Sequence, residues 1–278
     1  KIAIKKLGDA LAESGTTFSS DNDPELVKDA LPFSLKLIES LLAESPRHRG
    51  LLLAASSGFT QYAYAFIKQE ADEAEADNFS RATELRQRAR NLFLRARDYG
   101  VRGLETTHPN FSAALDKDPR LAVQDARAAD VPLLYWTAAS WGLGIAVSKD
   151  IPDLIADQPK VEAMIDRALE LNESYENGAI HSFLITYEQA RKGASGTPES
   201  RIRPHFERAV QLSEGKLATP MVSYAESVSL MELNRTEFET MLRRALAVSP
   251  DARPEWRLMN LVAQRRARWL LSRVNDLF

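Results

Sequence analysis

Apolar residues in this chain recur every three or four positions in one segment after another. Val161, Met164 and Ala168 form one such stripe, and Phe238 and Leu242 begin another. This spacing places apolar side chains on one face of an α-helix, whereas the alternation typical of strands is nearly absent. We therefore predict an all-α chain. The expected helices span 23–44, 47–76, 79–106, 159–171, 177–191, 198–213, 220–232, 235–248 and 254–277, and two more begin at Asp118 and Asp130.

The stripes also resemble one another, which indicates internal repetition. An apolar residue followed two and three positions later by Arg and Ala occurs four times, ending at Ala96, Ala168, Ala209 and Ala245. These alanines lie 72, 41 and 36 residues apart. Tetratricopeptide repeats have a period of about 34 residues, and each repeat packs on the next. The pattern predicts a tetratricopeptide-like helical repeat array, an α-α superhelix with extra N- and C-terminal helices.

We expect this array to form a single domain over residues 1–278. Its degenerate repeats are most visible at 79–107, 135–172, 177–213 and 220–250, and a helix at 254–277 is expected to cap the C-terminal end. The uncharged segment 131–148 is at the short limit for crossing a bilayer and contains Pro132 and two glycines. Because amphipathic helices flank it, we expect a central buried helix instead.

The balance of charges excludes two classes of partner. The 278 residues include 36 Lys and Arg against 39 Asp and Glu, a net charge of −3, with both signs spread along the chain. The sequence has neither the basic footprint of a nucleic-acid-binding protein nor a polybasic segment for anionic lipids. It has no cysteine, so disulfides, thiol chemistry and cysteine zinc sites are excluded.

Five aromatic residues are candidates for the wall of a ligand-binding cavity. They are Tyr62, Tyr64, Tyr135, Trp136 and Trp141, and they lie in segments rich in Ala, Ser and Gly. Such rings offer a ligand a large apolar contact area with a polar tip. The alternative is that they simply fill the core, and the sequence leaves both interpretations open.

Arg265 is a second candidate for ligand binding. The expected buried face of the last helix consists of Leu258, Leu261, Val262 and Trp269. Helical geometry would place Arg265 in the middle of that face. A buried guanidinium needs an anionic partner, which is either a core Glu or the carboxylate of a ligand.

His181 lies beside the apolar stripe of its helix, where a hydrogen-bonded core histidine is a simpler interpretation than a ligand contact. The four histidines form no HExxH motif and no pair at i and i+4, so no metal site is expected. Motifs for nucleotide binding or for an activated nucleophile are also missing. We therefore expect no catalytic residues, no cofactor and no enzymatic activity.

Longer segments carry a family resemblance. DPELVKDALPFSLKLIESLL (23–42), RALELNESYENGAIHSF (167–183) and NLVAQRRARWLLSRVNDLF (260–278) are among those that resemble the TatT family, tetratricopeptide-like components associated with TRAP transporters. The resemblance implies a periplasmic lipoprotein, a homotrimer, and association with the solute-binding protein of the transporter. It also implies an internal tunnel or cleft with apolar walls. The lipid-bearing cysteine is expected upstream of Lys1.

Two functions therefore compete. The first is an accessory component of a bacterial TRAP-type uptake system that holds or hands over a small, partly apolar organic acid. The second is a tetratricopeptide scaffold that binds proteins and has no small-molecule ligand. An enclosed cavity with aromatic walls would favour the first, and an open polar groove would favour the second.

Overall fold

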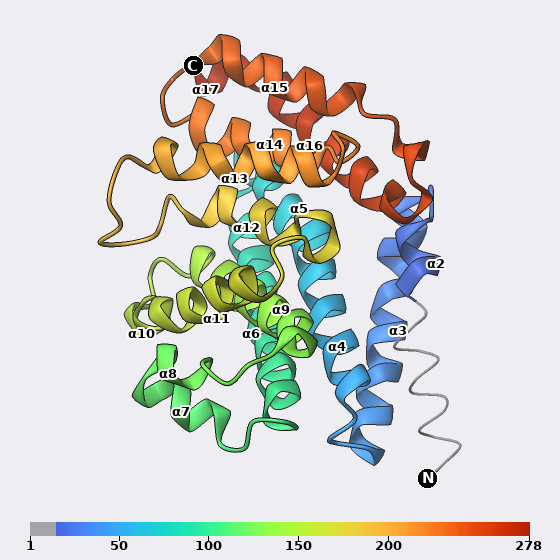
Figure 1. Cartoon of the computed structure of the whole chain (residues 1–278). Coiled ribbons are helices and arrows are strands. Elements are labelled where there is room, and N and C mark those ends of the chain that lie inside the picture. Colours follow the sequence, from blue (N-terminus) through green and yellow to red (C-terminus); the bar gives the residue numbers. More distant parts are fainter. Residues whose placement is uncertain (1–14) are drawn as a thin grey trace. The chain divides into compact units, whose positions relative to one another are not determined.

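The prediction of an all-α fold is confirmed. The computed structural model of the chain describes residues 15–278, and over that range it consists of helices and connections without a β-strand (Figure 1). The described chain divides into two compact units, which we treat separately. Unit 1 comprises Gly15 and Glu25–Asn172, and unit 2 comprises Thr16–Pro24 and Glu173–Phe278. The repeat array and the single domain over 1–278 stay predictions.

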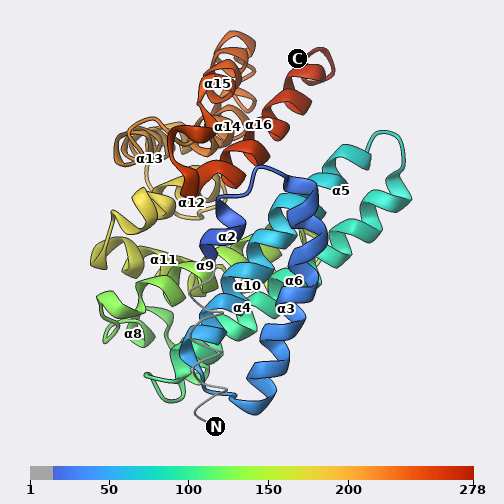
Figure 2. The same ribbon diagram turned by 90° about the vertical axis from the view of Figure 1, so that its right-hand side faces the viewer.

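Unit 1 is built around helices α3, α4, α6 and α9. The first three lie side by side, and α5 forms a hairpin with the start of α6 (Figures 1 and 2). The α-helices are α3 (Pro24–Glu44), α4 (Arg49–Tyr62), α5 (Gln69–Ala74), α6 (Phe79–Glu105), α7 (Phe111–Lys117), α8 (Pro119–Ala122), α9 (Val131–Ala146), α10 (Pro152–Ala156) and α11 (Gln158–Leu171). A π-helix, η1 (Ala63–Lys68), joins α4 to α5, and a 3-10 turn, η2 (Ala128–Asp130), precedes α9.

Unit 2 contains the remaining helices, whose core is formed mainly by α12 to α16. Its α-helices are α2 (Gly15–Ser19), α12 (Ala179–Tyr187), α13 (Pro198–Leu212), α14 (Thr219–Tyr224), α15 (Arg235–Ala247), α16 (Arg257–Ser272) and α17 (Val274–Leu277). The 3-10 turns are η3 (Tyr175–Asn177), η5 (Pro250–Ala252) and η6 (Pro254–Trp256), and η4 (Ala225–Ser229) is a π-helix.

The predicted helix bounds hold for several helices, and capping residues mark two of them. The expected helices at 79–106 and 235–248 are α6 and α15, and each begins after an Asn whose side chain accepts a backbone N–H, Asn78 or Asn234. The expected capping helix 254–277 is wrong as one element. It starts as the 3-10 turn η6, continues as α16, and is interrupted after Ser272 before the short α17.

Both π-helices start at a Tyr-Ala sequence. Ala63 is the first residue of η1 and follows Tyr62, and Ala225 is the first residue of η4 and follows Tyr224. The next long helix after each of them, α6 or α15, has an Asn cap. In unit 2, the Ser227 carbonyl within the π-helix accepts a hydrogen bond from the Gln189 side chain. A π-helix widens the turn and changes which side chains share a face, so a fixed 3.6-residue period cannot locate it.

Helix α9 confirms the prediction of a buried helix at 131–148. Its buried side chains point in all directions around the axis, from Val131 to Ile145. Helices α4, α6 and α11 pack against it. Among the described residues, no helix combines the length and the apolar character needed to span a membrane.

Helix α6 approaches both α9 and α4 closely at Gly100. A Cβ atom at this position would overlap Thr137 Oγ1 on α9 and lie 3.0 Å from Ser56 Oγ on α4. Thr137 cannot swing away easily, because it is fully buried and its hydroxyl donates to the Leu133 carbonyl. The absence of a side chain at Gly100 is therefore what permits the three helices to meet.

We predict that Gly100→Ala lowers the free energy of unfolding by about 1–3 kcal/mol, the usual cost of overpacking a core. Gly144→Ala on α9 is the matched control, because its Cβ would lie in ordinary contact, 3.4 Å from Leu94 Cδ2. The control should be neutral or gain up to about 1 kcal/mol from helix propensity. Urea unfolding measures both. Equal stability of the two variants would contradict the close approach.

Candidate functional site

Most of the predicted aromatic wall in unit 1 belongs to the packed interior. Tyr62, Tyr135 and Trp141 are buried, Trp136 is partly buried, and Tyr64 on η1 is 44% exposed. Tyr135 and Trp136 meet edge to face, with ring centroids 4.9 Å apart. Tyr64 and Trp136 are therefore the two rings of this set that a ligand could reach without opening the unit.

Trp141 lies between two cations. The Arg97 guanidinium of α6 lies 4.9 Å from the ring centroid, and the Lys160 ammonium of α11 lies 5.4 Å from it. Burial alone would lower the pKa of Lys160, but hydrogen bonds to Asp116 and Asp157 raise it above its ordinary value. The buried indole N–H has no hydrogen-bond partner in the described part of the chain. The arrangement ties α6, α9 and α11 together through cation–π contacts.

His181 in unit 2 is a buried histidine, with 6% of its surface exposed. Its Nδ1 lies 2.9 Å from Nδ1 of His205 on α13. Its Nε2 lies 3.4 Å from Glu173 Oε2. Burial lowers the pKa of His181. The sequence indicated a hydrogen-bonded histidine, but it could not indicate that the partner is a second histidine.

The expected centre of the buried face of α16 is wrong. Arg265 is only partly buried, as are the four apolar residues that were expected to surround it. The buried face consists of Asn260, Ala263, Gln264, Ala267 and Leu270.

Asn260 and Gln264 are buried because they satisfy backbone groups. The Asn260 side chain accepts the Ala218 N–H and donates to the Lys216 carbonyl. The Gln264 amide donates to the carbonyls of Ala245 and Val248. A prediction that counts only apolar residues as buried places such amides on the solvent side of the helix. The predicted buried face of α16 is therefore rotated about the helix axis from the observed one.

Arg266, the next residue along α16, forms an ion pair in unit 2. Arg266 Nη2 lies 2.6 Å from Glu226 Oε1 on η4, and the two side chains are 16% and 29% exposed. The same guanidinium stacks 4.4 Å from the centroid of the Trp269 ring. Arg266 thus joins α16 to the π-helix of unit 2.

Asp130 is the centre of a buried polar cluster in unit 1 that the sequence did not reveal. Its carboxylate accepts hydrogen bonds from Arg49 Nη2 at 2.7 Å and from the Arg127 N–H at 2.9 Å, and it lies 3.0 Å from His108 Nε2. Burial alone would raise the pKa of Asp130, but these hydrogen bonds lower it below its ordinary value. The cluster fixes the start of α9 to α4 and to the end of α6.

Glu188 has a comparable role in unit 2. It is buried at the end of α12 and pairs with Arg191 and with Arg201 of α13. Arg201 also donates to the carbonyls of Glu188 and Gly196. One arginine therefore holds both the end of α12 and the loop before α13, which is a structural role.

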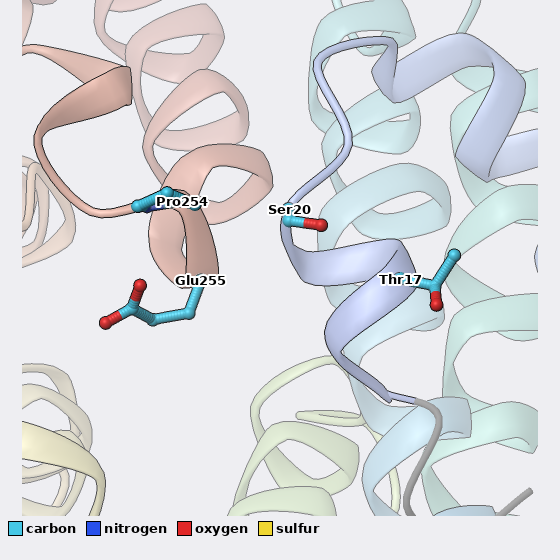
Figure 3. Close-up of a pocket in the computed structure, with 4 residues that line it drawn as sticks. All are labelled: Thr17, Ser20, Pro254 and Glu255. Carbon is cyan, nitrogen blue, oxygen red and sulfur yellow. The ribbon is translucent and has the colours of Figure 1, made fainter.

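Neither of two surface pockets includes any of the seven predicted ligand-binding residues. One, in unit 2, has a volume of about 410 Å³ and is lined by Thr17, Ser20, Pro254 and Glu255. Figure 3 shows Thr17 on α2, Ser20 directly after it, and Pro254 and Glu255 on η6, with Thr17 turned away from Pro254. The other, in unit 1, has about 220 Å³ and is lined mainly by polar residues of α8 and α11, Asp118, Arg120, Glu162 and Asp166 among them.

Titratable side chains give no metal centre in the part of the chain that the structure describes. No group of three or more His, Asp or Glu residues between 15 and 278 could hold a metal ion. The polar clusters around Asp130 and Glu188 are instead closed by arginines and backbone groups.

Comparison with known proteins identifies the family. Residues 20–278 match the family model described as TRAP transporter T-component. A Treponema pallidum (strain Nichols) protein, described only as uncharacterized, is 30% identical over 274 residues, which cover 96% of this chain and 84% of that protein. The family defines an accessory component of solute transport rather than an enzyme. The chain belongs to the TRAP transporter T-component family, as the resemblance of its sequence indicated.

Proposed function

We propose that this T-component associates with the periplasmic solute-binding protein of its TRAP transporter. The observation that carries the proposal is the family match, which extends over residues 20–278 and therefore includes both units. Family membership is also consistent with a periplasmic location. On the same basis we propose that the chain forms a homotrimer and that a lipid upstream of Lys1 tethers it to a membrane.

Light scattering of the purified chain, alone and mixed with the solute-binding protein of the same transporter, tests this association. We expect the chain alone to have the mass of three copies and the mixture to form a larger complex at micromolar concentration. The solute-binding protein of a transporter from another class is the control and should not bind. A mixture in which the two proteins keep their separate masses would contradict the proposal.

We further propose that the chain holds or hands over a small, partly apolar organic acid. The partial exposure of Arg265 supports a role in carboxylate recognition, because a guanidinium grips a carboxylate through two parallel hydrogen bonds. In unit 1, Trp136 and Tyr64 are the accessible rings for an apolar carbon body.

The alternative remains a protein-binding scaffold without a small ligand. It is favoured by the burial of Tyr62, Tyr135 and Trp141, which leaves few accessible rings to line a cavity. Neither described pocket contains these three rings.

Arg265→Met separates the two functions, with octanoate as the probe. Loss of a hydrogen bond to a charged group costs about 1.5–3 kcal/mol, so affinity for octanoate should fall roughly ten- to hundredfold. Arg268→Met, at an exposed position of the same helix, is the control and should bind octanoate normally. Calorimetry measures affinity, and melting curves check the fold. Absence of octanoate binding by the unmodified chain would favour the scaffold.

A further inference from the structure

Helix α3 of unit 1 carries apolar side chains on two opposite sides. Its inner side is buried and consists of Val27, Leu35, Ile38 and Leu42. On the other side Leu26, Phe33 and Leu37 are 58%, 75% and 37% exposed. Helical geometry places these three within about 40° of one another around the axis, and we call them the outer stripe. A helix that is apolar on more than one face is usually covered on all of them.

The outer stripe differs from the other exposed apolar residues of unit 1. Phe79 on α6 and Leu121 on α8 are also strongly exposed, but each is the only large apolar side chain exposed on its helix. Single apolar residues on a surface need no explanation, whereas a contiguous apolar patch marks a site of interaction. The stripe is such a patch, because its three members follow one another along one face of α3.

Contacts on the opposite side hold α3 in place. Leu35 packs directly on the backbone of α4, since a Cβ atom at Gly58 would lie 2.7 Å from Leu35 Cδ2. The Tyr99 hydroxyl of α6 donates a hydrogen bond to Glu39 at 2.8 Å. Helix α3 lies beside α4 (Figure 1), and these contacts leave the outer stripe uncovered. A surface on a fixed helix loses little conformational entropy when a partner binds to it.

The charge around the outer stripe is acidic. Helix α3 contains four acidic residues and two lysines. Both lysines pair with carboxylates, Lys28 with Glu70 and Lys36 with Glu39. Asp29 is exposed on the flank of the stripe. The outer side of α3 therefore has an apolar centre with an acidic edge.

This combination favours a separate partner protein over a second copy of the chain. An apolar centre with a polar rim is the usual composition of an interface between proteins that also exist apart. A second copy that docked through the same helix would bring another acidic edge against the first, and like charges at an interface are unfavourable. A partner with lysine or arginine beside an apolar patch would neutralise the edge instead.

We propose that the outer stripe of α3 is the surface on which the solute-binding protein docks, and that this partner presents an apolar patch flanked by lysine or arginine. The inference rests on the proposed association of the two proteins and adds the surface that mediates it. Phe33 is the central anchor, and Asp29 faces the basic side chains of the partner. Specific interfaces bury about 800 Å² on each side, so the stripe forms the centre of a larger contact.

Phe33→Gln tests the docking surface in the full chain, mixed with the solute-binding protein of the same transporter. Glutamine removes the apolar ring and is well tolerated in helices. Affinity measured by calorimetry should fall at least about tenfold, because a central aromatic anchor supplies much of the binding energy. Phe79→Gln, at the other strongly exposed phenylalanine of unit 1, is the matched control and should bind as the unmodified chain does.

Asp29→Lys tests the predicted charge of the partner. Reversing the charge at the edge of the stripe should weaken binding and reduce its dependence on salt, because salt screens the attraction between opposite charges. Asp150→Lys, at another exposed position of unit 1, is the control and should keep the salt dependence of the unmodified chain. A salt dependence that is equal in both variants would count against a basic partner at α3.

The outcomes separate this inference from the association on which it rests. If the unmodified chain and Phe33→Gln bind equally well, the docking surface is wrong and the association stands. If Phe33→Gln alone lowers the mass of the isolated chain in light scattering, a second copy covers the stripe and the inference is overturned. If the unmodified chain does not bind the solute-binding protein, the association itself fails and the docking surface with it.

Discussion

The contact at Gly100 is the constraint on which the architecture of unit 1 depends. Because this position has no side chain, α6 can touch Thr137 on α9 and Ser56 on α4 at the same time. Helix α9 is then covered by α4, α6 and α11, which allows an almost uncharged sequence to be buried all around its axis. The cluster around Asp130 fixes the start of the same helix to α4. The ionic cluster around Asp130 thus fixes the start of α9, and the close packing at Thr137 fixes its middle.

The sequence predicted elements whose interior is apolar and whose ends are capped. Helices α6 and α15 were located within a residue or two, because apolar periodicity and an Asn cap agree there. The face of α16 could not be predicted, since Asn260 and Gln264 are buried through hydrogen bonds to backbone groups of distant residues. The π-helices after Tyr62 and Tyr224 were missed because their wider turns interrupt the period on which the prediction relied.

The candidate site was less predictable than the fold. A sequence shows that Tyr62 or Trp141 is aromatic, but only the packing decides whether the ring fills a core or lines a cavity. The His181–His205 contact joins residues on two different helices, so no local sequence pattern predicts it. The buried face of α16 was predicted wrongly because two amides belong to it, and the ion pair of Arg266 with Glu226 was not foreseen. Family resemblance, in contrast, extends over most of the chain and carries the functional conclusion.

The chain belongs to a family of accessory components of TRAP transporters, so solute uptake through its transporter should depend on it. The test is uptake of the solute that the transporter's own solute-binding protein binds, measured in cells with and without this chain. Removing the chain should reduce transporter-dependent uptake, while the isolated solute-binding protein keeps its affinity for the solute. Restoring the chain should restore uptake. Uptake that is unchanged without the chain would contradict its role as an accessory component.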